Sequence, residues 1–263
     1  MFKLINKIQF SKESNRMKEI ANTVIARKLY QETKSKNLKF LLKERFGWMN
    51  NFIDNSDNGI EVGSGAGFLK DYIYNKNLKL TDLSDDEHLD IKNIDAQRTN
   101  FANESFNYVI ASNMIHHLPY PLKFFNEMHR ILKKGGKLII FDAHCSILLQ
   151  LVLILMKHEG FDFTKNVWSL NEPSTDDKSL WSGNSAIPYL IFNDKKIFKE
   201  KLGSKFNLKH LKLCECLLFL NSGGVTSKTF YIPLNFFFLK IIKYIDITLS
   251  LIFPKLFSLA YKI

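Results

Sequence analysis

Residues 58–82 read NGIEVGSGAGFLKDYIYNKNLKLTD, and this stretch decides the fold of the chain. It opens with a short apolar strand that ends at Val62, and three closely spaced glycines follow. Apolar residues then recur at helical spacing over 68–73, and a second apolar strand is predicted over 78–82. Strand, tight loop, helix and strand in this order predict an α/β protein with a parallel sheet.

The alternation of strands and helices continues downstream. A brief third strand is predicted over 91–94 and a fourth over 108–111. A helix is expected to start at Pro121 and to stop at Gly135 and Gly136, and a fifth strand follows over 137–141. Such a chain predicts helices on both faces of the sheet and ligands at the carboxyl ends of the strands.

The segments on either side of this core are less regular. Two amphipathic helices are predicted before it, one from Asn15 onward and one over 37–54. After it, residues 146–156 form an apolar run that is too short to span a bilayer, and residues 160–205 have the mixed composition of an insertion or lid. From Phe236 onward the chain predicts an apolar helix with a narrow polar strip.

The glycine loop has the pattern E-x-G-x-G-x-G, with Glu61 followed by Gly63, Gly65 and Gly67. Glycines permit positive φ and let the backbone approach a ligand closely, so a nucleotide-like ligand fits such a loop. The dinucleotide fingerprint G-x-G-x-x-G would need a glycine at Phe68, which disfavours NAD. A tight turn without a ligand is the alternative.

The loop does not stand alone. The runs GIEVGSGAGFLKDYI, LTDLS, NIDAQ and FNYVIASNMIHHLPYPLKFFNEMHRILKKGGKLIIFD resemble the successive motifs of class I S-adenosylmethionine-dependent methyltransferases. The resemblance is to the ubiquinone-biosynthesis-like, type 11 group, and it covers residues 58–142. It implies a Rossmann-like, seven-stranded, mostly parallel sheet in which residues 58–142 are the cofactor-binding core, and S-adenosyl-L-methionine as the cofactor.

The resemblance also implies which residues hold the cofactor. The glycine loop would wrap the methionine part, Asp82 would hold the ribose hydroxyls with charge-assisted hydrogen bonds, and Asp95 would read the adenine amino group. Each aspartate is alternatively a turn cap. The implied cofactor residues are Glu61, Gly63, Ser64, Gly65, Gly67, Asp82, Leu83, Asp95, Ala96, Ser112 and Asn113.

Methyl transfer needs a general base only when the acceptor must lose a proton, as a hydroxyl does, and histidine suits that role near neutral pH. The candidates are His117, His144 and His158, with His116 beside the first; position favours His117 and His144. A structural role for each histidine is the alternative.

Three later runs, HEGFD (158–162), GNSAIP (183–188) and NSGGV (221–225), resemble features of bacterial methyltransferases from surface-polysaccharide gene clusters. That resemblance implies an acceptor pocket lined by His158, Glu159, Asn184 and Ser222. Asn184 as a turn residue and the glycines at 223–224 as a hairpin tip are the alternatives.

Composition bears on the partners and the compartment. Lys and Arg number 37 against 26 Asp and Glu, a formal net charge of +11, which favours anionic lipid or negatively charged substrates. Three unpaired cysteines and a basic N-terminus without a secretory signal predict a cytoplasmic protein. The sequence has no zinc, iron or P-loop pattern and no RNA-reading motif, so neither a metal nor a nucleic acid is predicted.

We therefore expect a methyltransferase domain over 1–227 and a basic, apolar C-terminal extension over 228–263 that lies in a membrane interface or packs on the core. The expected function is methyl transfer to a small molecule, a cell-envelope sugar or lipid-linked intermediate at the inner membrane face. A quinone or other lipid methyltransferase, a non-catalytic cofactor-binding membrane protein and a nucleotide-sugar oxidoreductase are the alternatives.

Overall fold

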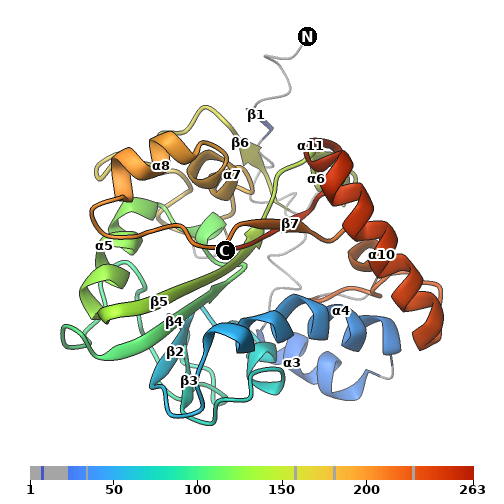
Figure 1. Ribbon diagram of the computed structural model, residues 1–263, viewed down its shortest axis with the longest axis horizontal. Helices are drawn as coiled ribbons and strands as arrows, with labels where there is room; N and C mark the ends of the chain where they lie inside the picture. Colours follow the sequence, from blue (N-terminus) through green and yellow to red (C-terminus); the bar gives the residue numbers. More distant parts are fainter. Residues whose placement is uncertain (1–6, 9–22, 34, 157–158, 180–181, 227–228) are drawn as a thin grey trace.

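A six-stranded sheet forms the centre of the part of the chain that the computed structural model describes, residues 7–8, 23–33, 35–156, 159–179, 182–226 and 229–263 (Figure 1). The strand order is β3-β2-β4-β5-β8-β7. The strands are β2 (Gly59–Val62), β3 (Leu78–Thr81), β4 (Phe106–Ser112), β5 (Leu132–Ala143), β7 (Lys212–Cys214) and β8 (Ala260–Lys262). The pairs β2 with β3, β2 with β4, and β4 with β5 are parallel, whereas β8 runs antiparallel to both β5 and β7.

Helices cover both faces of the sheet, as the sequence predicted. Along β4, Val109 and Ala111 face a core built with α5 (Pro121–Ile131), α7 (Ile187–Phe192) and α8 (Lys195–Leu202). Tyr108 and Ile110 face the opposite core, which includes side chains of α3 (Thr23–Glu32), α4 (Lys36–Phe46) and η1 (Gly47–Phe52). Burial on both faces explains why this strand is continuously apolar.

The structure corrects several element boundaries. The helix predicted over 37–54 is α4 followed by the 3-10 turn η1, and α5 ends at Ile131, since β5 already begins at Leu132. The third strand predicted over 91–94 is wrong, since these residues contribute only an isolated bridge between Ile91 and Thr81. The seven strands implied by the resemblance are not confirmed, because the sheet of the described residues has six.

The helix predicted after the glycine loop is also wrong, because only the short 3-10 turn η2 (Phe68–Asp71) forms there. The side chain of Asn50 binds backbone groups that a longer helix would use, and Asn75 ties the end of the segment to the loop before β2. Asn50 donates to the carbonyl of Tyr72 and accepts from the N–H of Tyr74, and Asn75 donates to the carbonyls of Asp54 and Asp57. Local side-chain hydrogen bonds of this kind compete with helix formation.

Two further pieces lie beside the sheet. The apolar run forms α6 (Ile147–Met156) as predicted, and β6 (Phe161–Asp162) pairs antiparallel with β1 (Lys7–Ile8). The segment predicted to be an insertion or lid, 160–205, contains β6, α7 and α8.

The C-terminal part consists of α9 (Leu217–Leu220), α10 (Phe236–Ile252), α11 (Pro254–Phe257) and β8. Because β8 lies between β5 and β7, residues 260–262 belong to the central sheet. The boundary at 227/228 stays a prediction, but the chain after it is joined to the sheet.

Helix α10 turns Lys243, Asp246 and Ser250 toward the protein, whereas Lys240 and most of its apolar side chains are exposed. Asp246 is buried and accepts hydrogen bonds from three backbone N–H groups at the start of α9, and Ser250 is buried as well. In contrast, Phe237 is 65% exposed and Leu251 is 76% exposed. The expected alternative, in which the wide apolar face of this helix packs on the core, is therefore not seen: polar residues make the contacts and the apolar side faces solvent.

A buried ion pair ties α4 to the strand β7. Arg45 donates from Nε and Nη2 to the two carboxylate oxygens of Glu215 at 3.0 and 2.6 Å, and the two side chains are only 4% and 7% exposed. Glu215→Gln should lower the free energy of unfolding by about 3 kcal/mol, because it leaves the guanidinium buried without its counter-charge.

Urea unfolding measures this change. Glu32→Gln is the matched control, since the pair of Glu32 with Lys28 is exposed and is worth less than about 0.5 kcal/mol. Equal effects of the two substitutions would contradict the importance of the buried pair.

Candidate active site

The register of the sheet brings the predicted site together at one edge. Val62 pairs with Thr81 on one side and with Ala111 on the other, and Ser112 pairs with Phe141. Gly63, Asp82 and Asn113, which directly follow β2, β3 and β4, and Asp142, the last residue but one of β5, therefore lie at the carboxyl ends of neighbouring strands. This is the edge at which open α/β sheets bind ligands.

Asp82 holds the glycine loop in shape. Its Oδ2 accepts from the N–H of Gly65 at 2.8 Å, and its Oδ1 accepts from the N–H of Ser84 at 3.1 Å. On the other side of the loop, His88 Nε2 lies 2.7 Å from the carbonyl oxygen of Gly65, and Arg27 of α3 donates to the carbonyl of Ala66 at 2.9 Å. The loop is thus preorganised from both sides.

Two observations show that the loop fits a ligand. Gly65 has a φ of +51°, and a Cβ placed there would meet nothing within 4 Å, so the backbone faces open space. Glu61 Oε2 is buried and has no hydrogen-bond partner in the described structure. Burial raises the pKa of Glu61 well above its usual value. The charge on Asp82 raises it further, and a hydrogen bond with Ser64 lowers it only in part. A buried carboxyl oxygen without a hydrogen-bond partner is costly unless a bound group pairs with it.

The other implied cofactor residues lie around this edge. Asp95 caps a turn, since its Oδ1 accepts from the N–H of Gln97 at 2.8 Å. Ala96 is buried and Leu83 is exposed. Asn113 has a positive φ of 51°, and its N–H donates to the carbonyl of Phe141. These geometries are compatible with the turn-cap reading of Asp95, and its role toward a cofactor stays a prediction.

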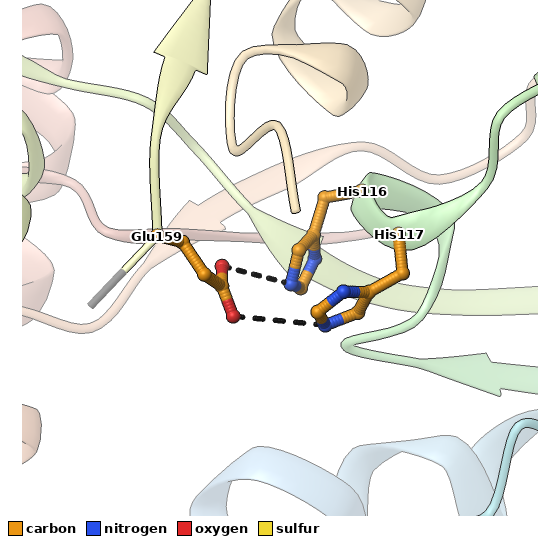
Figure 2. Close-up of side chains that lie close together, drawn as sticks. All are labelled: His116, His117 and Glu159. Atoms are coloured by element: carbon orange, nitrogen blue, oxygen red, sulfur yellow. Dashed lines mark ion pairs between the residues drawn. The ribbon is translucent and has the colours of Figure 1, made fainter. Parts of the chain in front are cut away.

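A second cluster follows β4, in the short turn η3 (Ile115–His117). Figure 2 shows the rings of His116 and His117 facing one carboxylate, that of Glu159. His116 Nε2 lies 3.2 Å from Glu159 Oε2, and His117 Nε2 lies 3.6 Å from Glu159 Oε1. Ser185 donates to Glu159 Oε2 at 3.2 Å, and the N–H of Asn184 donates to the carbonyl of His116 at 2.8 Å.

Asp142, at the end of β5, supports this cluster from the sheet. The side chain is fully buried; its Oδ1 lies 2.5 Å from His116 Nδ1, and its Oδ2 accepts from the N–H of Ile115 at 2.8 Å. Asp142 was not among the predicted site residues. Its place directly after a strand was the one sequence signal, and the same signal marked Asp82.

The two histidines have opposite pKa shifts. Burial alone would lower the pKa of His116, but the charges of Asp142 and Glu159 outweigh burial and raise it well above its usual value. Burial, together with the nearby charge of His116, lowers the pKa of His117 to about 4. At neutral pH the ring of His117 is therefore uncharged and has a lone pair.

The remaining predicted residues do not join this cluster in the same way. His144 is buried, its Nδ1 lies 2.9 Å from the carbonyl oxygen of Ser258, and burial lowers its pKa. Those contacts are those of a structural histidine. Ser222 is buried shortly after α9, and its carbonyl accepts a hydrogen bond from Ser35, the residue that caps α4. His158 lies outside the described residues.

Residues 60–140 match the family model described as a methyltransferase domain. The match covers less than half of the chain, and it spans β2, the glycine loop, β4 and most of β5. It agrees with the resemblance seen in the sequence: residues 60–140 are similar to a methyltransferase domain. No curated protein matches the chain.

Solved structures with a similar arrangement share little sequence with this chain. A SAM-dependent methyltransferase from Thermotoga maritima is 15% identical, over 76% of this chain and 81% of its own, with a TM-score of 0.44. The MccD protein is 14% identical over 86% and 94%, with a TM-score of 0.43. The trans-methyltransferase CalH, solved with S-adenosylhomocysteine (SAH), is 17% identical over 40% and 35%, with a TM-score of 0.31. With scores this low, these likenesses carry no weight for the function.

The Asp82 carboxylate should contribute directly to cofactor affinity. Asp82→Asn should weaken binding of S-adenosylhomocysteine by about 10-fold or more, because a charge-assisted hydrogen bond becomes a neutral one and the glycine loop loses an anchor. Calorimetric titration measures the affinity.

Asp85→Asn is the matched control, because Asp85 is exposed on the same loop and its substitution removes the same charge. Equal affinities for all three proteins would remove Asp82 from the cofactor site.

Proposed function

We propose that this chain transfers the methyl group of S-adenosylmethionine to a hydroxyl of a cell-envelope sugar or of a lipid-linked intermediate at the cytoplasmic face of the membrane. The observation that carries the proposal is the cluster of His116, His117 and Glu159 beside the glycine loop. A hydroxyl acceptor must lose a proton, and few other acceptors would need such a cluster.

The cluster and the loop are neighbours through one contact. Met114, which directly precedes η3, packs against Gly63 so closely that a Cβ on Gly63 would lie 2.7 Å from Met114 Cγ. Since the loop is the expected place of the methionine part of the cofactor, an acceptor bound at the cluster would lie near the transferable methyl group. Alignment of the two reactants supplies most of the rate enhancement in such a transfer.

The residues have separate tasks in this reaction. The glycine loop, Glu61 and Asp82 would hold S-adenosylmethionine, which supplies a methyl group on a sulfonium centre. As the oxygen–carbon bond forms, the carbon–sulfur bond breaks and sulfur keeps its electron pair. The proton of the acceptor hydroxyl passes to the cluster, where the Nε2 lone pair of His117 is directed away from Ser182.

The outward face of α10 supports a lipid-linked acceptor. Exposed apolar side chains on α10, α11, the residue between them and α6 include Phe236, Phe237, Phe238, Ile241, Ile245, Leu251, Ile252, Phe253, Leu256, Leu151 and Leu155. Such an extent of exposed apolar surface is uncommon on a monomeric soluble protein. Because the polar strip of α10 is occupied by the protein itself, the apolar face is the one left for a partner.

Charge favours an anionic lipid surface as that partner. Lys240 and Lys255 are exposed on α10 and α11, next to these apolar side chains, and the whole chain has a net charge of +11. An apolar face flanked by lysines is the pattern of a helix that lies in the membrane interface. Among the described helices, none has the length and apolar character needed to cross a bilayer.

Labelled methyl transfer tests the reaction. With S-adenosylmethionine labelled in the methyl group and membrane extracts of the source cell, label should enter a glycan or glycolipid fraction, and mass spectrometry should find an O-methylated sugar. His117→Gln should slow this transfer by about 100-fold or more, because the acceptor proton loses its acceptor.

Two other outcomes would decide against this acceptor. Label in a quinone or simple lipid would support the quinone or lipid methyltransferase instead. Cofactor binding without any transfer would favour the non-catalytic reading, and binding of NAD in place of S-adenosylhomocysteine would favour the oxidoreductase.

Vesicle co-sedimentation tests the membrane surface. The full chain should sediment with vesicles that contain anionic lipid, and the double substitution Phe237→Ser and Leu251→Ser should reduce the bound fraction several-fold, because each removes a large exposed apolar side chain.

Ile197→Ser is the matched control, since Ile197 is an exposed apolar residue on α8, far from α10 in Figure 1. Unchanged sedimentation of the double variant, or burial of α10 in a dimer of this chain, would contradict the membrane proposal.

A further inference from the structure

The hydrogen bonds of His116 and His117 fix the direction of their lone pairs. His116 Nδ1 faces the carboxylate of Asp142 at 2.5 Å, and His117 Nδ1 faces the carbonyl oxygen of Ser182 at 3.3 Å. Both partners accept hydrogen bonds only, so each Nδ1 carries the hydrogen. In the neutral rings, the lone pair is therefore on Nε2.

Both Nε2 atoms then face a third electron-rich group. The carboxylate of Glu159 lies 3.2 Å from His116 Nε2 and 3.6 Å from His117 Nε2, and the three ligand atoms lie within 4.8 Å of one another. If His116 carried a second proton, on Nε2, it could donate a hydrogen bond to Glu159. It would leave the lone pair of His117 facing a carboxylate oxygen, which is a repulsive arrangement without a cation between them.

We propose that His116, His117 and Glu159 bind one divalent transition-metal ion. The donor spacing suits such an ion, because ligands at about 2.0–2.2 Å from a four-coordinate metal lie roughly 3.3–3.5 Å apart. Two imidazoles and one carboxylate are a ligand set for Zn²⁺, Fe²⁺ or Co²⁺ with a position left for substrate. Figure 2 shows the three side chains converging on one point from η3 and from the segment that leads into β6.

The surroundings have the features of a metal site. Metal-bound histidines usually donate their other ring N–H to a carboxylate or a backbone carbonyl, which orients the ring. Asp142 does this for His116 and Ser182 for His117, and Ser185 donates to Glu159. The sequence indicated these three residues as candidates for a base and an acceptor pocket, and it predicted no metal, because Glu159 is far from the histidine pair along the chain and no metal-binding motif contains this spacing.

The catalytic role of the ion rests on the proposed function, whereas its binding does not. An acceptor hydroxyl coordinated to the ion would be more acidic, as metal-bound water is. Because the Nε2 lone pair of His117 would bind the ion, the proton of the hydroxyl would pass to solvent water. The bonds formed and broken in the methyl transfer would be those described above. The ion would also fix the acceptor oxygen next to the glycine loop.

Metal titration of the full chain tests the site directly. After removal of metal with a chelator, calorimetry with Zn²⁺ and the absorption spectrum with Co²⁺ should show one tightly bound ion per chain. Glu159→Gln and His117→Gln should each weaken binding at least about 10-fold. Asp142→Asn should weaken it by about 10- to 100-fold, because an amide that donates to His116 Nδ1 moves the ring hydrogen to Nε2.

His129→Gln is the matched control, since His129 is an exposed histidine on α5 and its loss should leave affinity unchanged. Circular dichroism shows which variants fold, and the half-buried His117 keeps the test open if Glu159→Gln does not fold. Wild-type binding no tighter than that of folded His117→Gln would overturn the site. Metal binding without affinity for S-adenosylhomocysteine would retain the site and reject the proposed methyl transfer.

Discussion

The register of β2 against its two neighbours is the constraint on which the rest of the structure depends. It is pinned at Gly59, which pairs with Tyr108: a Cβ at Gly59 would lie 2.2 Å from the tyrosine ring, so a side chain cannot stand there without displacing the ring. A slip by one residue would exchange the two faces of β2 and move Glu61 away from its buried position. The edge that holds the glycine loop, Asp82 and Asp142 exists because this register ends neighbouring strands at the same level.

Much of the fold could be predicted from local pattern. The strands around Val62, Leu80 and Ile110 are short apolar runs with clear limits, and the amphipathic α5 has a proline at its start. Local pattern failed where long-range contacts decide. The helix expected after Gly67 is opposed by Asn50, which is distant in sequence and binds the backbone of Tyr72 and Tyr74. Residues 260–262 join the sheet through β8, whose partner β5 is also distant in sequence.

The site residues also fall into those that local pattern predicts and those that long-range contacts bring together. The glycine loop and Asp82 are contiguous motif residues, so the sequence indicated them together. The cluster of His116, Glu159 and Asp142 is assembled from three separate segments, and none of its spacings is a motif. Position in the sequence favoured His144 as well as His117, but burial and the carbonyl of Ser258 make His144 part of the scaffold. A cluster that only the tertiary fold brings together cannot be predicted from the local pattern of any one segment.

Helix α10 is not a flexible tether. It leads through α11 into β8, where Tyr261 pairs with Asp142, the residue that orients His116. If the outward face of α10 rests on a bilayer, the reacting groups are held at a fixed height and tilt above the lipid headgroups. The distance of a hydroxyl from the membrane surface, and not only the shape of the pocket, would then select the acceptor. A hydroxyl close to the lipid part of the acceptor and one several sugars away from it would not be equally accessible.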